Sequence, residues 1–122
     1  MSGISLRVVI AVAMLAAAGT AWAAPAWKYV RNIGMWQFVV VEPRASADTA
    51  TLMQAVKAVC TPGRACMVVF WSDAAAVPVS MPMTHAQQQA VVARYMHNPT
   101  GVREELLVRC RVDEPAGARC LR

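Results

Sequence analysis

The sequence predicts a small α/β or α+β domain in which two helices pack on one three-stranded sheet, in the order β-α-β-α-β. Two short segments rich in β-branched and aromatic residues, 35–42 and 66–72, have the composition of buried strands. Each is followed by a segment with helical signals, and residues 102–112 alternate apolar and charged side chains as a half-buried strand does. A helix between two strands usually gives a right-handed crossover, so parallel pairing is expected.

The first two predicted strands occupy the middle of the sheet. Residues 24–32 lack a regular pattern and are expected to form an irregular lead. The strand MWQFVVVE, residues 35–42, then runs as far as Pro43, which cannot donate to a ladder. The second strand, residues 66–72, is also apolar on both faces, as a strand with neighbours on both sides should be.

Capping residues mark the start of both predicted helices. Ser46 or Asp48 caps the first helix, which ends at a Thr-Pro-Gly turn. Thr84 and Gln87 have the spacing of a capping box, so the second helix is expected to start there and to run to about His97. The apolar stripe of the first helix consists of Leu52, Ala55, Val56 and Val59, and that of the second of Val92, Tyr95 and Met96.

The last predicted strand, residues 102–112, has one charged face. Because side chains alternate along a strand, Arg103, Arg109 and Arg111 share one face, while Val108 and its alternate neighbours share the other. The sheet would therefore present arginines on the face that the helices leave open.

The first 23 residues have the three-part pattern of a secretory signal. Arg7 precedes a short apolar run, residues 8–18, and Ala21-Trp22-Ala23 offers the small residues that a signal peptidase reads. We expect cleavage after Ala23, with Ala26 as the alternative site. The remaining residues, 24–122, are expected to form one exported domain, periplasmic or secreted, without a membrane span.

The even number of cysteines predicts two disulfides in an exported chain. Four cysteines allow three connectivities. Cys60 and Cys66 flank a turn-rich loop, and Cys110 and Cys120 flank a second loop that contains Pro and Gly. Local closure therefore favours the pairs Cys60–Cys66 and Cys110–Cys120, whereas the spacing is not that of a usual zinc site.

The sequence contains no motif that indicates an enzyme or a cofactor. The phosphate-binding glycine loops and the nucleophile elbow are absent, and the only histidines, His85 and His97, lie too far apart on the predicted helix to share a metal ion. Without the signal segment the formal charge of +5 falls to +4, which is compatible with an anionic partner. We expect a non-enzymatic protein with no cofactor and no nucleic-acid partner.

The leading hypothesis is a binding or interaction domain that uses the open sheet face. Arginine beside tryptophan makes a recognition surface for anionic or aromatic groups. The candidate residues are Arg103, Arg109, Arg111, Trp36 and Trp71. The partner would be a protein or an anionic ligand, and an uncovered sheet face could also support a homodimer.

An alternative hypothesis is a periplasmic Cu(I)- or Ag(I)-binding protein. Thioether sulfur and imidazole are suitable ligands for these ions, and Met81, Met83 and His85 stand at alternate positions. The capping box at Thr84 argues against this site, because it places His85 in a helix rather than in an extended segment. The scatter of methionines along the chain favours a packing role for them.

Overall fold

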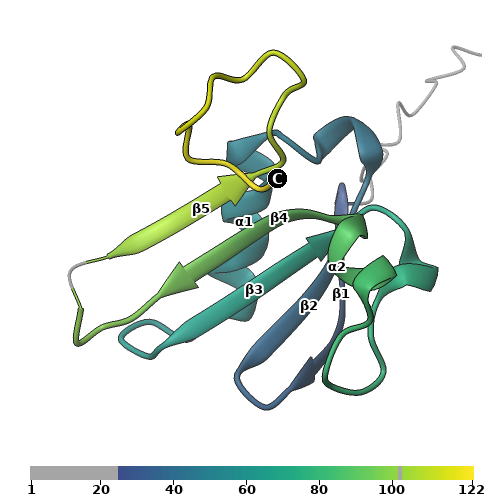
Figure 1. Cartoon of the computed structure of the whole chain (residues 1–122). Coiled ribbons are helices and arrows are strands. Elements are labelled where there is room, and N and C mark those ends of the chain that lie inside the picture. Colours follow the sequence, from purple (N-terminus) through teal and green to yellow (C-terminus); the bar gives the residue numbers. More distant parts are fainter. Residues whose placement is uncertain (1–24, 102) are drawn as a thin grey trace, which may run out of the picture.

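The computed structural model describes residues 25–101 and 103–122, which contain a five-stranded mixed sheet (Figure 1). The strands lie in the order β1-β2-β3-β4-β5; β2 and β3 are parallel, and every other neighbouring pair is antiparallel. The elements are β1 (Trp27–Ile33), β2 (Trp36–Val41), η1 (Pro43–Ala45), α1 (Thr49–Val59), β3 (Cys66–Trp71), η2 (Ala74–Ala76), α2 (His85–Ala90), β4 (Val91–His97) and β5 (Glu104–Val108).

The predicted three-stranded sheet is therefore wrong, and the largest error lies in the second predicted helix. Thr84 does cap a helix, but α2 ends at Ala90 and the chain continues directly as β4. Along β4 the side chains of Val91, Ala93 and Tyr95 are buried in alternation, which is the period of a strand. The reason is tertiary: β3 is apolar on both faces and needs a hydrogen-bonded neighbour on each side, and β4 supplies the second one.

The predicted irregular lead is also wrong, because residues 27–33 form β1. This strand pairs with β2 in a hairpin whose two-residue loop contains Gly34 at a φ of 59°. Glycine adopts that left-handed conformation without steric cost, and such loops suit the twist of a hairpin. A register shift between Tyr29 and Arg31 breaks the simple alternation of β1, which explains the absence of a regular pattern in its sequence.

The last strand is shorter than predicted. β5 covers Glu104–Val108, and beyond it the chain turns back so that Leu121 bridges to Arg109. Within β5 the predicted alternation holds, since Leu106 and Val108 pack toward α1. Of the further residues assigned to this strand, Val102 lies outside the described residues.

The sheet buries a separate apolar cluster on each face. Figure 1 shows α1 behind the sheet and α2 in front of it. The rear cluster joins the sheet to α1 through Leu52, and the front cluster joins it to the segment between β3 and β4 through Val77 and Met83. The strand residues of the rear cluster are Val39, Val41, Cys66, Val68, Phe70, Ala93 and Tyr95, and those of the front cluster are Phe38, Val69, Trp71 and Val91.

Both predicted disulfide pairings are confirmed. Cys60 and Cys66 have their Cα atoms 5.8 Å apart, and those of Cys110 and Cys120 are 5.0 Å apart. Disulfides persist in oxidising compartments, so the folded chain is suited to an extracytoplasmic or otherwise oxidising environment. No helix among residues 25–101 and 103–122 is long and apolar enough to cross a bilayer. The predicted signal segment, residues 1–23, lies outside the described residues.

Candidate binding groove

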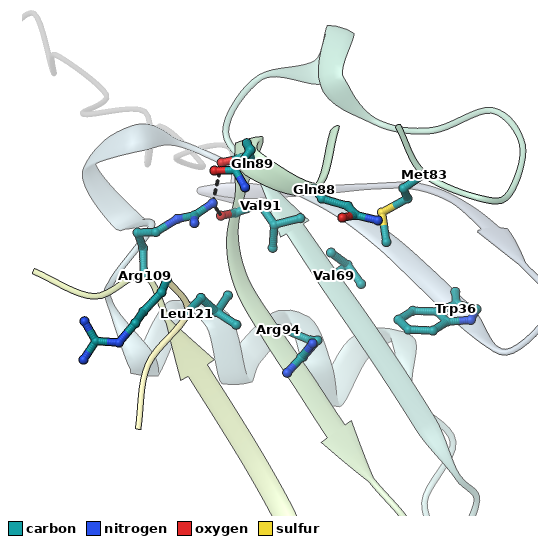
Figure 2. A pocket seen from close by; sticks show the side chains of 10 residues that line it. Trp36, Val69, Met83, Gln88, Gln89, Val91, Arg94, Arg109 and Leu121 are labelled. Carbon is teal, nitrogen blue, oxygen red and sulfur yellow. Dashed lines mark hydrogen bonds between the residues drawn. The ribbon is translucent and has the colours of Figure 1, made fainter. Parts of the chain in front are cut away.

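A groove of about 390 Å³ lies on the front of the sheet, beside α2 and the end of the chain (Figure 2). Val69 of β3 and Val91 of β4 lie on its floor, and Trp36 of β2 stands at its far side. The complete lining consists of Trp36, Val69, Met83, Gln88, Gln89, Val91, Arg94, Arg109, Leu121 and Arg122.

One wall of the groove is α2, which local hydrogen bonds hold in place. The Gln87 amide donates to the Thr84 hydroxyl at 3.1 Å, and the Thr84 amide donates to the Gln87 side chain at 2.8 Å, so the predicted capping box is confirmed. The indole Nε1 of Trp71 donates to the Gln87 carbonyl at 2.9 Å. Trp71 is fully buried and meets Phe38 edge to face, with ring centroids 5.1 Å apart. A buried aromatic pair therefore anchors the helix to the sheet.

Among the described residues that line the groove, Arg94 is the one charged residue that a strand of the sheet supplies. It stands on β4 between Val69 of β3 and Leu107 of β5, and its side chain is half-buried. The ion pairs within the described residues involve other arginines, namely Arg44, Arg111 and Arg119. A half-buried guanidinium that lies between two apolar cross-strand neighbours and has no carboxylate partner in the described part of the chain favours an anion brought from outside.

Arg109 closes the groove at the opposite side from Trp36 (Figure 2). Its guanidinium donates to the backbone carbonyls of Gln89 and Val91, where α2 ends and β4 begins. A cation favours the carbonyl end of a helix, so Arg109 fixes the junction between the groove wall and the groove floor. Its role is to position the wall.

The charged side chains that line the groove all have the same sign. Arg94, Arg109 and Arg122 are cationic, and the amides of Gln88 and Gln89 add neutral donors and acceptors. Trp36, Met83 and Leu121 supply apolar surface. The groove combines a positive field with an apolar floor, which suits a ligand that has an anionic head and a flat or apolar body.

A second set of polar side chains, those of Tyr95, Glu104 and His97, lies on the face of the sheet that α1 covers. The Tyr95 hydroxyl donates to the Glu104 carboxylate at 3.2 Å, and burial, followed by this hydrogen bond and the charge of Glu104, raises the pKa of the Tyr95 phenol. His97 is the neighbour of Glu104 across the strands, and its Nδ1 is buried without a hydrogen-bond partner among the described residues.

The residues of the predicted recognition surface are only partly brought together. Trp36 and Arg109 both line the groove. Trp71 lies beneath α2 rather than on an exposed face. Arg103 lines a separate depression along β5, and Arg111 is exposed in the loop after β5, where it pairs with Asp113.

The three residues of the alternative metal site lie in different surroundings. Met83 is half-buried, packs in the front cluster and points into the groove (Figure 2). Met81 is 38% exposed, and His85 is exposed as the first residue of α2. Of the three, Met83 alone lines the groove.

Sequence reasoning missed Arg94 and Leu121 as groove residues. Arg94 was hidden by the assignment of its segment to a helix, in which it appeared on the solvent side. An alternation of Val91, Ala93 and Tyr95 around Arg94 was the available signal. Leu121 reaches the groove because the loop closed by the predicted Cys110–Cys120 disulfide brings it back beside Val108 and Cys110. The loop closure was predictable, but its sequence does not indicate that Leu121 packs in the front cluster.

Comparisons with models of known protein families, with curated proteins and with solved structures find no match to this chain.

Proposed function

We propose that this protein is an exported binding domain that holds an anionic ligand with an apolar or aromatic body in the groove on the front of its sheet. The observation that carries the proposal is Arg94, a half-buried guanidinium in the sheet with no carboxylate partner among the described residues. An anionic head at Arg94 would supply the charge-assisted hydrogen bonds that the chain does not. The body of the ligand would lie against Trp36 and Val69.

The chemistry of the lining supports binding rather than catalysis. Guanidinium and amide groups orient and neutralise an anion, but near neutral pH they are neither general bases nor nucleophiles. Export through the amino-terminal signal would deliver the chain to the periplasm or the exterior, where the two disulfides form.

The experiment uses 2-naphthoate as the probe and its neutral analogue 2-naphthamide as the matched control ligand. Titration is followed by the NMR resonances of the arginine Nε–H groups and of the Trp36 indole. Binding of the carboxylate should move the resonances of Arg94 and Trp36. The amide should bind at least about tenfold more weakly, because one charge-assisted hydrogen bond contributes about 1.5–3 kcal/mol.

Arg94→Gln is the decisive variant, and Arg111→Gln is its control. Both substitutions remove one positive charge, but Arg111 lies outside the groove lining. We expect about a tenfold loss of naphthoate affinity for Arg94→Gln, the loss that corresponds to 1.4 kcal/mol, and little change for Arg111→Gln. An equal loss in the two variants would mean that net charge alone attracts the probe, and the proposed groove function would be abandoned.

A further inference from the structure

The sheet register brings two methionines together on the exposed part of the front face. Met67 of β3 lies directly opposite Met96 of β4, and its neighbour on the other side is Trp36 of β2. Directly opposed residues on neighbouring strands have Cβ atoms about 4.5–5.5 Å apart. The long, unbranched side chains of the two methionines can therefore bring both sulfur atoms to one point.

Packing does not account for these two side chains. Among the described methionines, Met53 packs in the rear cluster and Met83 in the front cluster, whereas Met67 and Met96 belong to neither. Met67 is half-buried and Met96 is 40% exposed. Two adjacent thioethers at the surface of a sheet are thus accessible from solvent and free of a core role.

We infer that the Met67 and Met96 thioethers, with the Trp36 indole beside them, form a binding site for a soft monovalent metal ion, Cu(I) or Ag(I). Thioether sulfur selects such ions, and the face of an indole attracts a cation electrostatically. The four cysteines are bound in disulfides and do not compete as thiolate ligands. The described residues hold no group of three His, Cys, Asp or Glu side chains that would favour a harder ion.

Charged neighbours modulate this site. Arg94 stands two residues before Met96 on the same face of β4, so its charge opposes cation binding. Glu105 of β5 is the neighbour of Met96 on the other side and pairs with Arg119. Removing the Arg94 charge should therefore raise the affinity for a monovalent cation roughly two- to tenfold, as expected for unit charges several ångströms apart in a largely aqueous, salt-screened surrounding.

The test uses Ag(I) as a redox-inert probe, in chloride-free buffer, on protein labelled with ¹³C at the methionine methyl groups. Substoichiometric Ag(I) should shift the methyl resonances of Met67 and Met96 and quench or shift the Trp36 indole signal. The resonances of Met81 and Met83 serve as an internal comparison for the segment between β3 and α2. Stationary Met67 and Met96 resonances would overturn the proposal, and so would shifts confined to Met81, Met83 and His85.

Variants provide an independent readout. Met67→Leu with Met96→Leu conserves volume, so the fold should persist, as far-UV circular dichroism would verify, and Ag(I) affinity should fall at least tenfold. Met81→Leu with Met83→Leu is the matched control and should retain the affinity of the parent protein. Arg94→Gln should bind Ag(I) more tightly. Unchanged affinity in the Met67/Met96 variant would overturn the assignment; if that variant did not fold, the methyl shifts of the parent protein would decide the matter.

Discussion

Replacing Arg109 by alanine should destabilise the fold, whereas the same replacement of Arg111 should leave it nearly unchanged. The two arginines stand two residues apart, and the sequence places them on one face of one strand. In the structure Arg109 donates to two backbone carbonyls, and Arg111 pairs at the surface with Asp113. The pair of variants therefore separates what alternation predicts from what the tertiary structure adds.

The expected loss for Arg109→Ala follows from the surroundings of the two carbonyls. Hydrogen bonds to charged groups contribute about 1.5–3 kcal/mol each when water cannot replace them. The bond to Gln89 is exposed, so water restores most of it, while the bond to Val91 is partly buried and is largely lost. The total should be about 2 kcal/mol. The side chains of Arg111 and Asp113 are 76% and 75% exposed, so Arg111→Ala should cost no more than about 0.5 kcal/mol.

Urea unfolding under non-reducing conditions, followed by tryptophan fluorescence, measures the difference. For an m-value of about 2 kcal/mol/M, a loss of about 2 kcal/mol lowers the unfolding midpoint by about 1 M. Arg109→Lys keeps the charge but presents a single ammonium, so it should recover part of the loss. Equal midpoints for Arg109→Ala and Arg111→Ala would refute the assignment of Arg109 to the junction between α2 and β4.

Two further outcomes follow from local geometry. Thr84→Ala removes the cap of a six-residue helix and should lower the free energy of unfolding in urea by about 1 kcal/mol. It should also weaken naphthoate binding, because Gln88 and Gln89 of α2 line the groove. Undiminished binding would contradict the role of α2 as a wall of the groove. Tyr95 has a pKa raised above 10.0 in the fold, so the folded state holds the phenol proton more tightly than the unfolded chain does. The contribution of Tyr95 to the free energy of unfolding is fully present below pH 10 and is lost as the pH rises through the folded pKa. The urea midpoint of Tyr95→Phe should therefore fall less between pH 9 and pH 11 than that of the parent protein.

The sequence by itself determined the features that depend on residues close together in the chain. The capping box of Thr84 and Gln87 is local, because each side chain bonds to a backbone amide three residues away. The two disulfides were predictable because each closes a short turn-rich loop. The helix from Thr49 and the two central strands were recognisable from an apolar stripe and from apolar runs of strand length.

The extent of the sheet was decided by tertiary pairing. The segment of β4 fits both periods, because Val92, Tyr95 and Met96 have helical spacing while Val91, Ala93 and Tyr95 alternate. The stability of this segment as a strand depends on its hydrogen bonds to β3 on one side and to β5 on the other. No pattern in the sequence of the segment itself indicates these bonds. β1 was missed for a similar reason, since a register shift disrupts its alternation.

The candidate sites also depend on pairing across strands. Trp36 and Arg109 were recognisable as residue types suited to recognition, but Arg94 enters the groove only because β4 is a strand beside β3. Met67 and Met96 are far apart in sequence and become neighbours through the same register. The type of each side chain determines what it can do chemically. Long-range hydrogen bonding between strands and the burial of both sheet faces determine which partners it meets, and these interactions form only as the chain folds.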